Sequence, residues 1–361
     1  MKYMKKHTSV QEATQHRILN FMSALISPLK FGALLVDSRL LIQHARLAEK
    51  HGFDFVAVGE HLMRHTPSGP TLSALPALAA AAGATTRLGL LSSVVIAPLH
   101  NPVRLAKDAA VVDVISGGRL TLGLGIGGEF PREFELAGIP VIERASRTDE
   151  SIPLLRRLWM EREVNHIGHH FKVNTVTLDP SPVQRGGPAI WVGGRTDAAI
   201  RRSGRFGDGW IPYLYTPEQY EVSVRKVSKA FASSHRRRGL GHQNHAERIS
   251  IDPSKPVLDG MRPFAWGLHL MTTIRTTYEE ALVDTVSSLS SAYRYGGDYA
   301  HLAARYTLLG NPDDCLEMLR MFVKAGARHI LLAWQGDPDR VSDQIAQAGE
   351  ELLPVARCIT V

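Results

Sequence analysis

Residues 85–128 read TTRLGLLSSVVIAPLHNPVRLAKDAAVVDVISGGRLTLGLGIGG, and this stretch decides the fold. It starts with an apolar run at 88–96, continues through a helical pattern at 102–115 and ends in a second apolar run at 119–124. Strands that are covered by helices on both faces have no polar side, so they appear as continuous apolar runs. The stretch therefore predicts one parallel βαβ unit.

The same alternation extends in both directions along the chain. We predict eight strands, at 30–36, 54–58, 88–96, 119–124, 189–193, 209–213, 266–272 and 328–333. Helical patterns lie between them, at 38–51, 71–83, 102–115, 145–160, 196–206, 217–238, 278–294 and 339–353. Asn311 and Pro312 open a further helix before the last strand. Strict alternation of eight strands and eight helices favours a closed (β/α)8 TIM barrel over an open doubly wound sheet.

The chain divides into an extension and one catalytic domain. Residues 1–28 precede the first strand and predict an N-terminal extension, and residues 29–361 form the barrel domain. Two long insertions, at about 161–188 and 239–265, interrupt the later βα connections. The first resembles a small β excursion, and the second is polar, contains proline and is typical of a mobile loop or lid.

Composition excludes several classes of protein. Apolar residues make up 44% of the chain, yet no apolar stretch reaches the roughly 18 residues of a membrane span. The two cysteines, Cys315 and Cys358, predict reduced thiols in a cytoplasmic protein. The formal charge of +7 gathers in 1–28 and 235–248 rather than in a nucleic-acid-binding module. We therefore expect neither a membrane nor a nucleic acid as partner.

Three segments together resemble a known family. They are 85–128, GFDFVAVGEH at 52–61 and PVQRGGPAIWVGGRTDAAIRRSGRFGDGWIPYLYTPEQY at 182–220. In order and spacing they are similar to the bacterial luciferase-like family, the luciferase-like monooxygenases and their deazaflavin-dependent relatives, over roughly 30–340. The resemblance implies a TIM-barrel oxidoreductase that acts on a small organic molecule at a reduced FMN or 8-hydroxy-5-deazaflavin coenzyme.

The resemblance leaves the cofactor open. FMN implies oxygen activation with a flavin reductase as partner, whereas the deazaflavin implies hydride transfer and a deazaflavin-reducing dehydrogenase as partner. The pattern of GGE after the fourth strand with PxQxGGPxIWVGG favours the deazaflavin. We expect a homodimer. The alternative function is a non-catalytic, flavin-binding partner subunit of a heterodimer.

A glycine-rich turn after the fifth strand is the candidate phosphate site. Gly193 and Gly194 permit close approach of the backbone to an anion, Arg195 adds a charge and Thr196 adds a hydroxyl at a helix N-terminus. The alternative is a tight turn in which Thr196 only caps the helix.

The third and fourth strands carry the candidate ring site. The resemblance implies a cis peptide bond between Ser93 and Val94, in a bulge that presses on the central ring of the cofactor; the alternative is an ordinary strand. It also implies that the glycines of the fourth strand, Gly125 among them, make room for that ring. The spacing GxGxGG at 123–128 does not match a dinucleotide fingerprint. Glu129 follows as a candidate catalytic residue, a polar group over the site.

The second strand ends in Gly59-Glu60-His61 and delivers an imidazole to the mouth of the barrel. We predict His61 as the acid/base, because imidazole exchanges protons near neutral pH. The alternative is a satisfied structural histidine. Glu60 is predicted to be a cofactor-binding residue, as an orienter of the site or as a buried hydrogen-bond partner. The histidines at 166–170 and 242–245 lack a carboxylate or cysteine at ligand spacing, so we predict no metal.

Overall fold

The eight apolar runs form strands that pair in one closed parallel sheet. In the computed structural model, which describes residues 27–63, 71–239, 262–292 and 297–359, each strand pairs with the next and the last pairs with the first. The barrel strands are β1 Lys30–Leu34, β2 Phe55–Val58, β3 Gly89–Ser92, β5 Leu120–Gly125, β8 Ala189–Gly193, β9 Gly209–Ile211, β10 Ala265–Ile274 and β12 His329–Trp334. The predicted (β/α)8 barrel is confirmed.

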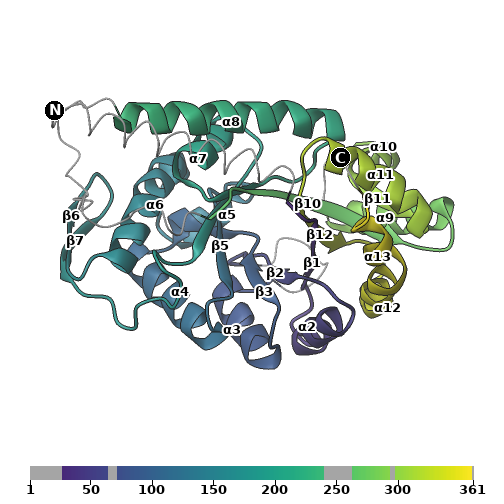
Figure 1. Ribbon diagram of the computed structural model, residues 1–361, viewed down its shortest axis with the longest axis horizontal. Coiled ribbons are helices and arrows are strands. Elements are labelled where there is room, and N and C mark those ends of the chain that lie inside the picture. Colours follow the sequence, from purple (N-terminus) through teal and green to yellow (C-terminus); the bar gives the residue numbers. More distant parts are fainter. Residues whose placement is uncertain (1–26, 64–70, 240–261, 293–296, 360–361) are drawn as a thin grey trace, which may run out of the picture.

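Helices cover the outside of this barrel (Figure 1). The main ones are α2 Leu41–Lys50, α3 Ala74–Ala84, α4 Pro102–Ser116, α6 Arg144–Met160, α7 Asp197–Phe206, α8 Pro217–Gly239, α9 Tyr278–Ala292, α11 Pro312–Lys324 and α12 Val341–Gln347. The predicted helix after Asn311 is α11, where the Asn311 side chain accepts from the backbone N–H of Asp314 and the Asp314 side chain accepts from that of Asn311. No helix within the described residues has both the length and the apolar composition that a membrane crossing needs.

The long connections lie where they were expected, after the helix that follows the fourth barrel strand and before the seventh barrel strand. Residues between α6 and β8 form an antiparallel hairpin, β6 Val164–Ile167 with β7 Lys172–Val176, which confirms the β excursion. The second connection runs from α8 to β10, and most of it, like the extension at 1–28, lies outside the described residues. Both connections join a helix to a strand, so they are αβ rather than βα connections. The first therefore enters β8 at its amino end, opposite the mouth where the site was expected.

One unit between β10 and β12 has no counterpart in the predicted alternation. The helix α10 Tyr299–Tyr306 leads directly into the strand β11 Thr307–Gly310. This strand pairs in parallel with the distal half of β10, Met271 to Ile274, and stands outside the closed barrel. No turn residue separates this helix from this strand, because Tyr306 and Thr307 are adjacent.

Candidate active site

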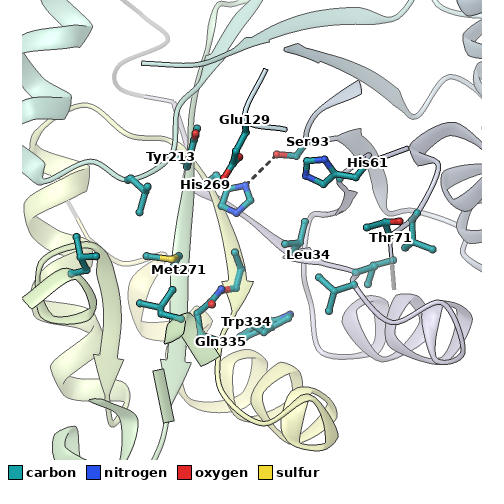
Figure 2. Close-up of a pocket in the computed structure, with 18 of the residues that line it drawn as sticks. Leu34, His61, Thr71, Ser93, Glu129, Tyr213, His269, Met271, Trp334 and Gln335 are labelled. Atoms are coloured by element: carbon teal, nitrogen blue, oxygen red, sulfur yellow. Dashed lines mark hydrogen bonds between the residues drawn. The ribbon is translucent and has the colours of Figure 1, made fainter. Parts of the chain in front are cut away.

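A cavity of about 390 Å³ opens at the carboxyl ends of the barrel strands. Figure 2 shows His61, Ser93, Glu129, Tyr213 and His269 around one end of it. These side chains come from positions at or just after five different strands. This is the face on which TIM barrels build their sites, so the position predicted for the site agrees with the cavity.

The third strand is interrupted at Ser93. The peptide bond between Ser93 and Val94 is cis, as predicted, and the short strand β4 Val95–Ile96 resumes the pairing with β5 beyond it. The Ser92 hydroxyl donates to the Gly123 carbonyl and accepts from the Gly123 N–H, at 2.9 and 2.8 Å. The bulge is thus anchored to β5, and Ser93 faces the cavity.

Glycines on the neighbouring strands give this bulge its space. A Cβ atom at Gly125 would lie 2.5 Å from Cγ2 of Val94, and one at Gly193 would lie 2.9 Å from Cγ1 of the same residue. Contacts this short do not occur between real side chains, so Val94 requires glycine on both sides. Gly125 and Gly193 therefore accommodate Val94 directly, whereas for Gly125 the expected neighbour was the cofactor ring.

His269 on β10 is a residue that the sequence analysis missed. Its Nδ1 lies 3.4 Å from the Ser93 hydroxyl oxygen (Figure 2). Burial lowers the pKa of His269 to about 4, so the ring is neutral at pH 7. The available signal was a single histidine inside the apolar run 266–272, a position that a polar side chain occupies at a cost unless it has a partner.

His61 lines the cavity and contacts a second carboxylate, Glu133. Its Nδ1 lies 3.3 Å from Oε1 of Glu133, and the same oxygen accepts the backbone N–H of Leu62 at 2.6 Å. Glu133 lies in α5 Pro131–Leu136, and its side chain is 1% exposed. The ring edge of His61 also meets Phe130, with centroids 5.2 Å apart. Sequence reasoning missed Glu133, because it lies 72 positions from His61 and no local spacing reports a contact over that distance.

Glu60 points to a different partner. Its Oε2 accepts the backbone N–H of Ile96 at 3.0 Å and contacts Nε2 of His100 at 2.8 Å. Burial disfavours the charge on His100, but the carboxylate outweighs burial and raises the pKa of His100. Glu60 is not among the described residues that line the cavity. In this structure it is a hydrogen-bond partner that fastens β4 and the turn after it, and its predicted contact with the cofactor stays a prediction.

Glu129 and Arg195 meet around Tyr213. Glu129 and Tyr213 both line the cavity, and the guanidinium of Arg195 lies 5.3 Å from the centre of the Tyr213 ring. Burial, and after it the Glu129 carboxylate, raises the pKa of Tyr213, so the phenol keeps its proton at neutral pH. Tyr213, which the sequence analysis also missed, connects the cavity to the candidate phosphate turn.

Two aromatic side chains hold the turn after β8 by donating hydrogen bonds to its carbonyl oxygens. Trp210 Nε1 donates to the Gly194 carbonyl at 2.8 Å, and the Tyr215 hydroxyl donates to the Arg195 carbonyl at 3.2 Å. Gly194 has φ of +114°, a conformation that favours glycine. Thr196 is the N-cap of α7, with its hydroxyl accepting from the Ala199 N–H at 3.2 Å. The capping role is thus present; the phosphate role stays a prediction.

The histidine-rich segments have other partners. His166 in the β6–β7 hairpin contacts Glu150 at 3.0 Å, and the His170 N–H donates to the same carboxylate at 2.9 Å. Within the part of the chain that the structure describes, no group of three or more metal-binding side chains is placed to hold an ion. His242 and His245 lie outside those residues.

Comparison with known proteins agrees with the geometry. The family model described as "Luciferase-like monooxygenase" matches residues 35–353. An F420-dependent glucose-6-phosphate dehydrogenase from Beutenbergia cavernae is 30% identical over 335 residues, which cover 88% of this chain and 94% of the relative. A 5,10-methylenetetrahydromethanopterin reductase from Archaeoglobus fulgidus is 24% identical over 90% of this chain and 99% of its own length.

Solved structures share the fold. A monooxygenase from Streptomyces bottropensis superposes with a TM-score of 0.74 at 24% identity, over 91% of this chain and 99% of its own. An F420-dependent secondary alcohol dehydrogenase superposes with a TM-score of 0.73 at 17% identity, with the same coverage of both chains. Since the family model spans most of the chain, this protein belongs to the luciferase-like monooxygenase family.

Proposed function

We propose that this protein is an oxidoreductase that transfers a hydride between a small organic substrate and the deazaflavin coenzyme F420. The observation that carries the proposal is the convergence of His61, Ser93, Glu129, Tyr213 and His269 on one cavity. The family relationship supports the same reaction, because curated relatives that cover most of the chain are F420-dependent enzymes.

The residues at the mouth fit a flat, anionic cofactor. The bulge at Ser93 and Val94 offers a rigid surface beside the cavity, because the Val94 side chain packs closely against the backbone at Gly125 and Gly193. The turn at Gly194 presents a helix N-terminus with Thr196 as its cap, which is the arrangement that favours a phosphate group. The guanidinium of Arg195 lies over the ring of Tyr213, so it adds a positive charge next to a residue that lines the cavity.

When bound, the cofactor supplies or accepts the hydride and so carries the redox chemistry. The protein has to handle the proton that accompanies it. Reduction of a carbonyl group adds a hydride to carbon and a proton to oxygen. His61, held at Nδ1 by Glu133, would give that proton from Nε2 and take it back in the reverse direction. Tyr213 and Glu129 would position the polar group of the substrate, and neutral His269 would position Ser93.

The competing version uses FMN, oxygen and a flavin reductase. A non-catalytic partner subunit is the third version, and it is disfavoured because the polar side chains named above all face the cavity. Such a subunit has no need for an imidazole–carboxylate pair at the mouth.

Titration of the full-length protein with F420 and with FMN tests the proposal. We expect tighter binding of F420, seen as a change in its fluorescence, and loss of the oxidised absorbance when an alcohol from a screened panel is added. Binding of FMN alone, with oxygen consumption after reduction, would replace F420 in the proposal. Failure to bind either cofactor would overturn it.

A further inference from the structure

The cavity has two ends of different chemistry. One end carries the polar side chains of His61, Ser93 and Glu129. Met271 and Trp334 lie at the other end (Figure 2), Leu289 and Tyr299 pack in one apolar cluster with Met271, and Leu302 lines the same cavity. Figure 2 shows Met271 and Trp334 well apart from Ser93 and Glu129, with His269 between the two groups.

The apolar end is the product of the additional unit between the seventh and eighth barrel strands. Leu289 lies on α9 and is 4% exposed, and Tyr299 and Leu302 lie on α10. Met271 is the residue of β10 that pairs with the first residue of β11, Thr307. Leu289, Met271 and Tyr299 pack with Leu309 of β11 into one small apolar cluster that is separate from the main core. The α10–β11 unit therefore gives this end of the cavity its wall.

Of the polar side chains at this end, the Gln335 amide is already engaged, whereas the buried Nε1–H of Trp334 has no acceptor in the described part of the chain. Gln335 donates from Nε2 to the Ala333 carbonyl at 3.2 Å, and its Oε1 accepts from Ser288 at 3.5 Å. Among the described residues that line the cavity, the imidazole and carboxylate side chains of His61, Glu129 and His269 stand at the other end, and Tyr299 brings a neutral phenol to the apolar end. An ionised ligand group at the apolar end would lose its hydration without a charged partner among the described lining residues, because Trp334 and Tyr299 offer only neutral hydrogen-bonding groups.

From this we propose that the apolar end binds the non-reacting part of the substrate, and that Leu302 limits the length of that part. The substrate class is then a neutral carbonyl compound, or the corresponding alcohol, with an aliphatic or alicyclic body. The reacting carbon would lie toward Ser93 and His61. The inference rests on the proposed hydride transfer for the reacting group, but the apolar end itself is tested without it.

Straight-chain methyl ketones, from acetone to 2-nonanone, are the probes. Their binding to the full-length protein is measured by calorimetry, with and without F420. Each methylene that enters the apolar end should raise the affinity about three- to fourfold. We expect this rise to continue over several carbons and then to stop, at the length where the wall at Leu302 is reached.

Two substitutions locate the wall. Leu302→Trp should stop the rise at a shorter ketone and weaken binding of the longest ketones about tenfold or more, with acetone changed less than twofold. The matched control is Val283→Trp on the outward face of α9, where the side chain is 68% exposed; it should leave the series unchanged. If Leu302→Trp does not fold, Leu302→Ala tests the same wall, because it should extend the rise by one or two carbons.

The results that overturn the inference are distinct from those that overturn the proposed function. An affinity independent of chain length rejects the apolar subsite, as does an equal effect of Leu302→Trp and Val283→Trp. Tighter binding of glucose 6-phosphate than of any ketone also rejects it. A clear length dependence without hydride transfer from any bound ketone or alcohol keeps the subsite and rejects the reaction. Hydride transfer without a length dependence does the reverse.

Discussion

The Nδ1 atom of His61 lies 3.3 Å from Oε1 of Glu133, and the Glu133 side chain is 1% exposed while that of His61 is 38% exposed. A buried carboxylate thus holds an imidazole that faces the cavity. Contacts of this kind fix the orientation and the tautomer of a histidine. The pair separates two roles, proton transfer at His61 and positioning at Glu133, which different substitutions can test.

Replacing His61 with alanine should remove proton transfer without removing the cofactor. We expect turnover to fall by roughly 10²–10⁴-fold and cofactor affinity to stay within a few-fold, because proton transfer contributes to the transition state. Turnover, affinity and thermal stability are measured on one preparation, with a substrate found by screening. His166→Ala, in the β6–β7 hairpin, is the control for loss of a histidine elsewhere. Normal turnover in a stable His61→Ala protein would transfer the acid/base role to Glu129.

Glu133→Gln should act on kcat through His61. The amide keeps the size of the side chain and an oxygen for the Leu62 N–H, but it no longer offers a carboxylate to Nδ1. We expect kcat to fall by about tenfold or more, with KM and cofactor affinity nearly unchanged. The decisive measurement is the comparison with Glu133→Asp, which restores the charge and should recover part of kcat. A loss confined to thermal stability would make Glu133 purely structural.

Adding a methyl group at Gly125 should disturb the bulge. The new Cβ would lie 2.5 Å from Val94 Cγ2, so the bulge has to shift, at about 1–3 kcal/mol of stability. Cofactor affinity should fall with it. Gly83→Ala, where no atom lies within 4 Å, is the control and should not destabilise the protein. If Val94→Ala in the same chain does not recover the stability of Gly125→Ala, the contact between the two residues is not the cause.

The turn at Gly194 should discriminate ligands by their phosphate. Gly194→Asp places a carboxylate where the phosphate of the ligand is expected, so the two negative charges repel each other. It also places a side chain at φ of +114°, which strains the backbone. Gly194→Ala has the strain alone. We expect Asp to weaken FMN binding at least tenfold more than Ala does, and to affect riboflavin, which lacks the phosphate, equally in both variants. Equal losses for FMN in the two variants would move the phosphate elsewhere.

Acid should destabilise the fold through His269 and His329, whose pKa values are lowered by desolvation. Burial lowers the pKa of His269 to about 4 and that of His329, at the start of β12, to about 3. Below the ordinary histidine pKa of 6.5 the unfolded chain binds protons that the native protein does not. Stability is therefore complete above that pH and falls as the pH drops toward 4, by up to about 1.4 kcal/mol per pH unit for each histidine.

Urea unfolding between pH 6.5 and 5 measures this loss, above the range in which most carboxylates titrate. His329→Gln cannot take up a proton, so the free energy of unfolding should depend less steeply on pH, by the contribution of one histidine. An unchanged slope would show that His329 is not the group that takes up the proton.

The sequence alone was enough for the barrel and for much of the mouth. Continuous apolar strands alternating with helices have few ways to bury both faces, so the local pattern determines the closed parallel sheet. His61, Ser93 and Glu129 come at or just after strand ends, and all three line the cavity. Their positions follow from the topology, since the carboxyl ends of all eight strands meet at one face.

Only the tertiary structure decided the partners of these residues. Glu133 lies 72 positions from His61, and His269 lies 176 positions from Ser93, so no local spacing reports either contact. The strand β11 escaped for the same reason, because it exists by pairing with an extended β10 and not through any periodic signal of its own. Short strands and buried polar pairs are determined by long-range neighbours, whereas amphipathic helices and apolar runs carry their own pattern.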